Sequence, residues 1–117
     1  MAAPNIVNVT TIIGKTAVQQ VTTSATAIVT NSAASGKVFK VNALYIANVD
    51  GAAAAEISVA LHRSSVSYEI AHTVSVPADA TLDVISKSIY LEEGDELRLT
   101  ASANSDLEAV CSYEEIS

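Results

Sequence analysis

The sequence predicts an all-β fold, specifically an antiparallel β-sandwich with a jelly-roll-like arrangement of about eight strands. From residue 66 to residue 113, apolar residues fall on alternate positions, a period of two that is typical of half-buried strands. Compact turns, such as residues 77–79 and 92–95, separate these alternating segments. The one helix-like run, the alanines at 52–55, is too short to nucleate a helix.

The N-terminal third has a different composition. Residues 1–36 carry one charged side chain, Lys15, and contain three β-prone pieces at residues 6–13, 16–22 and 25–30. Gly14 and Lys15 predict a turn between the first two pieces. We interpret residues 1–24 as an extended assembly arm and residues 25–117 as the β-sandwich domain. The alternative is that the arm is an ordinary first hairpin of the same sandwich.

The body of the predicted sandwich begins at Lys37. Residues 38–48 carry apolar side chains on both faces, which indicates a central strand covered on both sides. Residues 56–62 alternate cleanly, and two hairpins are expected to follow: 66–76 with 80–90, and 95–102 with 107–115. The side chains predicted to point inward are Phe39, Val41, Ile57, Val59, Leu61, Ile70, Leu82, Val84, Leu97 and Leu99.

Composition limits the classes of function. A chain of 117 residues fits one domain, but only 4% of the residues are aromatic, so the core is a thin, aliphatic one. We expect a neighbouring subunit to cover part of the apolar surface, which favours a homo-oligomer. The formal charge of −7 disfavours nucleic-acid binding, because such binding depends on Lys and Arg side chains that neutralise phosphates.

Neither a membrane anchor nor an export signal is expected. The sequence has no apolar run of about 18 residues and no basic amphipathic segment. Residues 1–5 lack the basic and apolar regions of a signal peptide. The single cysteine, Cys111, lies on the apolar register of the last predicted strand and is interpreted as a small buried hydrophobe.

The acidic segment around Gly94 is the strongest candidate for a ligand site. Glu92, Glu93, Asp95 and Glu96 could offer oxygen ligands to Ca²⁺, but their spacing differs from that of an EF-hand loop. We therefore expect a solvated turn that folds without metal.

Other candidate chemistry is sparse. His62 is expected at the surface and His72 is expected to be semi-buried, and two distant histidines with one distant thiol are too few for zinc. No Gly-x-Ser-x-Gly motif or phosphate loop occurs, although a Ser/His/Asp triad from unlinked strands stays open. We predict a protein that is not an enzyme, with no catalytic residue, cofactor or metal.

The tyrosines admit two interpretations. They could form a platform that stacks on carbohydrate, or they could pack in the core or at a subunit interface. The second is favoured because three of them fall on inward-pointing alternations. The four are Tyr45, Tyr68, Tyr90 and Tyr113.

Several segments resemble small virion structural proteins of tailed phages that infect marine cyanobacteria. The similar segments are residues 5–9, 14–17, 40–42, 45–48, 76–82, 88–95 and 108–115. The resemblance spans nearly the whole chain and implies a multi-copy component of the head, neck or tail. It carries no catalytic residues.

Two classes of function follow. The first is a structural subunit made in the host cytoplasm and placed in the virion with other virion proteins, foremost a capsid decoration or cement protein and alternatively a neck or tail/fibre component. The second is a module that binds glycans of the host surface. For the first class, the predicted assembly interface lies in the uncharged, β-prone arm, where such a segment can add a strand to a neighbour. Its residues are Ile6, Val7, Val9, Ile12 and Ile13.

Overall fold

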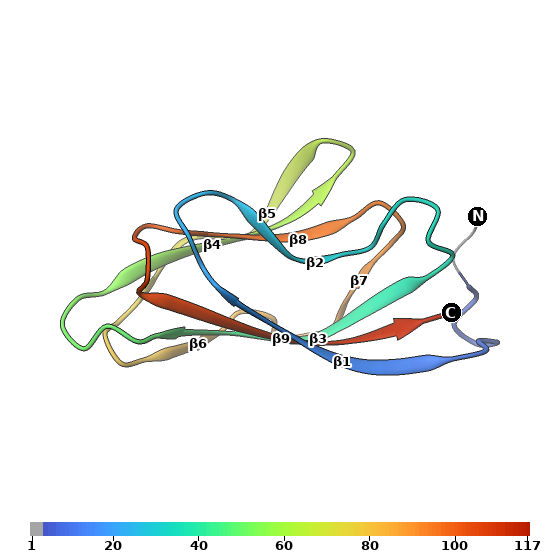
Figure 1. Ribbon diagram of the computed structural model, residues 1–117, viewed down its shortest axis with the longest axis horizontal. Helices are drawn as coiled ribbons and strands as arrows, with labels where there is room; N and C mark the ends of the chain where they lie inside the picture. The colour runs from blue at the N-terminus through green and yellow to red at the C-terminus, as the bar shows by residue number, and fades with distance from the viewer. Residues whose placement is uncertain (1–3) are drawn as a thin grey trace.

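The computed structural model describes residues 4–117 and confirms the all-β sandwich: these residues form two antiparallel sheets and no helix (Figure 1). One sheet has the order β1-β9-β3-β6, with β7 also paired to β3, and the other has the order β2-β8-β4-β5. The strands are β1 Ile12–Gln20, β2 Thr26–Thr30, β3 Val38–Asn48, β4 Ala55–Arg63, β5 Val66–Val76, β6 Thr81–Asp83, β7 Ile89–Leu91, β8 Glu96–Ala101 and β9 Leu107–Ile116.

Both predicted hairpins are wrong in their pairing. β5 and β6 belong to different sheets, and so do β8 and β9, so the chain crosses the sandwich at each of these turns. The hairpin that does form joins β4 to β5 across Ser64 and Ser65. If β6 and β7 are counted as one interrupted strand, the alternation between sheets is the connectivity expected of a jelly roll. That finer assignment stays a prediction.

A bulge in β3 explains why this strand carries apolar residues on both faces. The pairing of β3 with β9 shifts register between Val41 and Ala43. Before the bulge, the core receives the odd-numbered Phe39 and Val41, and after it the even-numbered Leu44 and Ile46. An extra residue in a strand exchanges the two faces because side chains alternate with a period of two. The strand is therefore central, but it does not carry a continuous apolar surface on each side.

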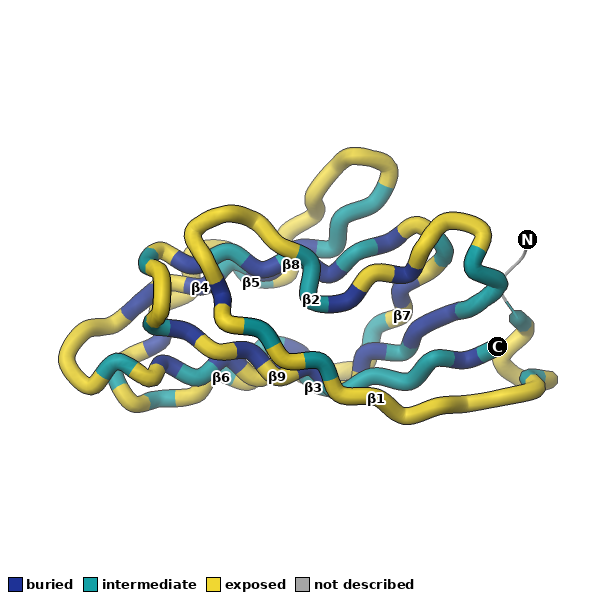
Figure 2. Tube along the Cα trace, viewed as in Figure 1, coloured by how far each residue is buried: buried dark blue, intermediate teal, exposed yellow. Residues whose placement is uncertain are grey.

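The core lies between the two sheets and is aliphatic. Six of the predicted inward residues are buried there: Phe39, Val41, Ile57, Val59, Leu97 and Leu99. Leu61, Leu82 and Val84 are half-buried and pack against this cluster. The prediction for Ile70 is wrong, since its side chain is 40% exposed. Ile70 lies on β5, an edge strand whose hairpin projects from the sandwich and is mostly exposed (Figures 1 and 2).

The strand β1 is an edge strand of its own chain's sheet. It pairs with β9 without a register shift, from Ile12 opposite Ile116 to Gln20 opposite Glu108. The turn predicted at Gly14 and Lys15 is therefore wrong. Residues 4–11 form no strand, although both Thr10 and Thr11 donate main-chain hydrogen bonds to the Ser117 carbonyl. The boundary predicted between arm and sandwich at residue 24 thus falls after a strand that already belongs to the sheet. Whether the arm also engages a neighbour stays a prediction.

Candidate functional site

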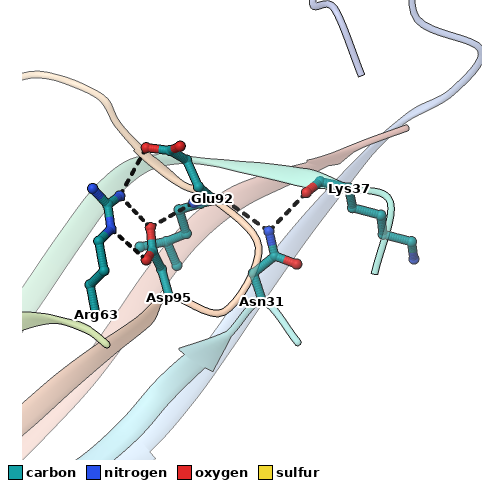
Figure 3. Close-up of polar contacts among 6 residues, drawn as sticks. Asn31, Lys37, Arg63, Glu92 and Asp95 are labelled. Carbon is teal, nitrogen blue, oxygen red and sulfur yellow. Dashed lines mark hydrogen bonds and ion pairs between the residues drawn. The ribbon is translucent and has the colours of Figure 1, made fainter. Parts of the chain in front are cut away.

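The acidic turn between β7 and β8 is held by an arginine from β4. Arg63 donates from Nε to Asp95 Oδ1 at 2.8 Å and from Nη2 to Asp95 Oδ2 at 2.6 Å (Figure 3). A further bond from Nη2 reaches Glu92 Oε2 at 2.9 Å, and the Glu92 main-chain N–H donates to Asp95 Oδ2. Asp95 is 1% exposed, so the expectation of a wholly solvated turn is wrong for this residue.

Burial and pairing act on the Asp95 carboxylate in opposite directions. Burial favours the neutral acid, but the hydrogen bonds from Arg63 and from the Glu92 N–H favour the charged form and outweigh it. The pKa of Asp95 therefore lies below its ordinary value. The same contacts raise the pKa of Arg63, which stays charged at any pH of interest. The Arg63–Asp95 ion pair links two neighbouring strands. Both carboxylate oxygens of Asp95 already accept hydrogen bonds from protein donors.

Asn31 stabilises the opposite side of this turn through hydrogen bonds. Its buried side-chain amide donates to the Lys37 and Leu91 carbonyls at 2.9 and 3.0 Å (Figure 3). Glu93 Oε2 accepts a hydrogen bond from the Gly36 N–H at 2.9 Å. In the sequence, Asn31 lies in a polar stretch and Arg63 follows an alternating segment, with no sign of these contacts. Their roles depend on partners from 6 to 60 positions away, so no local pattern signals them.

A second ion-pair group lies where the two termini of the described chain approach each other. The carboxylate of Glu115 contacts Lys15 Nζ at 3.0 Å and Lys37 Nζ at 3.1 Å. Partial burial opposes ionisation of Glu115, but the two lysine hydrogen bonds outweigh it and lower its pKa. Lys15, the one charged residue of β1, is thereby paired within its own sheet.

The two histidines contact different residues. His62 Nδ1 lies 2.9 Å from Ser67 Oγ, and His72 Nδ1 lies 3.1 Å from Glu69 Oε1. The expectation of a semi-buried His72 is wrong, since it is exposed on the projecting hairpin. Among residues 4–117, no group of three His, Cys, Asp or Glu side chains is placed to hold a metal ion.

The remaining candidates fall on different parts of the surface. Cys111 is buried, as predicted, and burial raises the pKa of its thiol to about 11. Tyr113 packs against Phe39 with ring centroids 5.6 Å apart. Tyr45, Tyr68 and Tyr90 are exposed, so packing of these three in the core is wrong, whereas packing at a subunit interface stays a prediction.

Four of the five predicted interface residues are exposed. Val7 is 90% exposed, and Ile6, Ile12 and Ile13 are about half exposed, whereas Val9 is half-buried. Ile6 and Pro4 line a shallow hollow with Val38 and Tyr90. The described N-terminal segment and the C-terminus lie at the same end of the molecule (Figure 1). The structure therefore gathers these apolar side chains around one end of β1.

Comparison with known proteins gives a likeness of fold. No family model matches the sequence, and no curated protein does. A structure of Bacillus endospore appendages, described as a novel family of disulfide-linked pili, matches with a TM-score of 0.55 and 13% identity, over 92% of this chain and 88% of that one. The nucleoplasmin-like N-terminal domain of Drosophila FKBP39 matches with a TM-score of 0.45 and 14% identity, over 87% and 85%. The first match shows a shared fold alone, and the second is too distant to support a conclusion. No helix in the described part of the chain is long and apolar enough to span a bilayer.

Proposed function

We propose that this chain is a non-enzymatic structural subunit of a multi-copy particle, and that the particle is the virion of a tailed phage, where the chain acts as a capsid decoration or cement protein. The observation that carries the proposal is the group of exposed apolar side chains at Ile6, Val7, Ile12 and Ile13. Such a group is unfavourable in water and is typical of a surface that binds another protein.

The position of this group beside an open sheet edge supports the same proposal. Residues 4–11 lead directly into β1, and within residues 4–117 no strand pairs with the outer edge of β1. A neighbouring protein can gain main-chain hydrogen bonds at such an edge and cover the isoleucines at the same time. Many copies on one particle strengthen weak individual contacts through effective concentration.

The appendage protein of similar fold adds a comparison. Those Bacillus appendages are disulfide-linked pili. Multi-copy assembly is part of our proposal for this chain, but a disulfide link is not, because the sequence holds one cysteine and that residue is buried. The neck, tail or fibre of the virion is the alternative location for the same kind of subunit.

A second candidate function is a module that binds glycans on the host surface. The exposed Tyr45, Tyr68 and Tyr90 favour it, since exposed aromatic rings can stack on sugars. Tyr68 lies on the projecting hairpin, whereas Tyr45 and Tyr90 belong to the other sheet, on or paired with β3. Glycan-array binding that is lost in Tyr68→Ala would favour this candidate.

Binding of the purified chain to particles that lack it tests the structural proposal. Replacing Ile6 and Val7 by Ser is expected to weaken particle binding while thermal unfolding stays unchanged, because both side chains are exposed. Val49→Ser is the matched control, since Val49 is half exposed in a loop outside the interface. Cryo-electron microscopy of the intact virion then places the chain on the capsid lattice or elsewhere. Undiminished binding by the Ile6/Val7 variant would contradict the interface.

A further inference from the structure

The main-chain groups on the outer edge of β1 can be assigned from its pairing with β9. Thr11 and Ser117 exchange both main-chain hydrogen bonds, and the Val21 N–H donates to Leu107. Hydrogen-bonded pairs alternate with non-bonded pairs along an antiparallel ladder. The odd-numbered residues of β1 therefore bond to β9, and the even-numbered residues 12–20 direct their N–H and C=O groups to the open edge.

Apart from one lysine, this edge has none of the devices that usually prevent edge-to-edge pairing. The strand runs for 9 residues with no proline and no bulge. Its single charge, Lys15, is engaged by Glu115. Ile12 and Val18 expose apolar side chains beside the edge, and Val18 is 74% exposed. An edge that stays free in water usually carries an unpaired charge or a break.

The lack of acidic residues in β1, together with the self-matching of two antiparallel edges, favours a second copy of the chain as the occupant. Each chain carries a formal charge of −7, so two copies repel each other over most approaches. The strand β1 contains no acidic residue, and its lysine is already paired. Two β1 strands can therefore meet without placing carboxylates against each other, and the outward donors and acceptors of an antiparallel pair match themselves across a two-fold axis.

Gly14 supports close approach of another backbone. It lies inside the strand, its φ is not positive, and a Cβ added there would meet no atom within 4 Å. Nothing in its own chain requires glycine at this position, although glycine weakens a strand. Glycine inside a strand often marks a place where another backbone comes near.

We infer that β1 pairs antiparallel with β1 of a second copy, centred on Thr16, so that two sandwiches share one continuous sheet. In this register all nine residues pair: Thr16 faces its own copy, Gly14 faces Val18, and Ile12 faces Gln20. A register centred on Lys15 would instead place two ammonium groups together. This dimer is the contact between copies of the proposed structural subunit, and its biological role rests on that proposal. The dimer itself is expected to form with the purified chain alone.

Cysteine substitution tests the register. In a hydrogen-bonded antiparallel pair the Cα atoms are about 5.5 Å apart, which is within the range of about 4.4–6.8 Å that a disulfide spans. With oxidised glutathione as the oxidant, Thr16→Cys is expected to give a covalent dimer on a non-reducing gel. Gln20→Cys is the matched control, exposed on the same face of the same strand but about 27 Å from its own copy. The native Cys111 is buried and does not interfere. No cross-link at Thr16→Cys, or equal cross-linking of both variants, would overturn the inference.

Proline substitution gives an independent test without cysteine. Val18→Pro removes an N–H that points to the open edge, so the sheet of its own chain keeps its hydrogen bonds. It is expected to weaken self-association by about tenfold, since one hydrogen bond is lost from each copy. Ala17→Pro, which removes an N–H directed at β9, is expected to destabilise the fold itself. Sedimentation equilibrium measures the association and circular dichroism the fold.

The outcomes separate this inference from the proposed function. A folded Val18→Pro variant that associates as strongly as the parent chain would overturn the β1 dimer. Loss of the dimer with particle binding retained would leave the structural role standing with a different contact between copies. Failure of the parent chain to bind particles, with the β1 dimer present in solution, would contradict the virion proposal alone.

Discussion

Arg63 and Asp95 form a two-point ion pair that ties the last residue of β4 to the residue that precedes β8. The two donor-acceptor distances are 2.8 Å for Nε to Oδ1 and 2.6 Å for Nη2 to Oδ2, and the residues are 32 positions apart in the chain. β4 and β8 are paired neighbours in the four-stranded sheet. The pair therefore fixes the end of this ladder and the acidic turn together.

Asp95→Asn is expected to lower the free energy of unfolding by about 1–3 kcal/mol, because a buried acceptor of charge-assisted hydrogen bonds is weakened. Glu92→Gln is the matched control. Its side chain is 68% exposed, so a loss below about 1 kcal/mol is expected. Urea denaturation of both variants measures the difference. A loss for Asp95→Asn no greater than that for Glu92→Gln would mean that the buried pair contributes nothing.

Stability is expected to fall in acid. The pKa values of Asp95 and Glu115 lie below the ordinary values of 3.8 and 4.5 in the folded protein. Their stabilising contribution is therefore fully present above those ordinary values and is lost as the pH falls through the lower, folded-state values. The unfolding free energy, measured by urea titration from pH 7 downward, should be level until about pH 5 and then decline. Asp95→Asn should show a shallower decline, and an identical profile would argue against Asp95 as a source.

Leu99→Ala is expected to cost about 2–5 kcal/mol, because Leu99 is fully buried between the sheets. Ile70→Ala provides the comparison for a side chain of similar size that projects from the sandwich. Its cost is expected to be within about 1 kcal/mol. Thermal unfolding of the two variants ranks them, and a larger cost at Ile70 would show that the hairpin packs on the body in solution.

The turn between β4 and β5 offers a stabilising change. Ser64 and Ser65 have φ values of 52° and 64°, the left-handed conformation that a two-residue hairpin turn of type I′ requires. Replacing them by Asn and Gly is expected to raise the unfolding free energy by about 1 kcal/mol, since these residues adopt that conformation at lower cost. Ser75→Gly, within β5, should instead lower it. Chemical denaturation of both variants checks the sign of each change.

Local patterns in the sequence were enough to predict the class of fold and several of its strands and core residues. The predicted strand at residues 38–48 has the bounds of β3, and Ile57 and Val59 point into the core as their alternation indicates. The burial of Cys111 followed from the same period of two. The apolar character of Ile12 and Ile13 was also visible, but their place on an open edge became clear only in the structure. Alternation and turn composition depend on neighbouring residues, so they can be read without a partner strand.

The tertiary structure decided what depends on distant segments. The turns at residues 77–80 and 102–106 look alike whether the chain reverses within a sheet or crosses to the other one, so the pairing of β5 and β9 could not be read from them. Ile70 alternates as a core residue would, yet its side chain is 40% exposed. Asp95 looks like part of a solvated turn in the sequence, because its partner Arg63 lies on β4, 32 positions away. A period of two specifies which side chains share a face, whereas the burial of that face depends on which strand comes to lie against it.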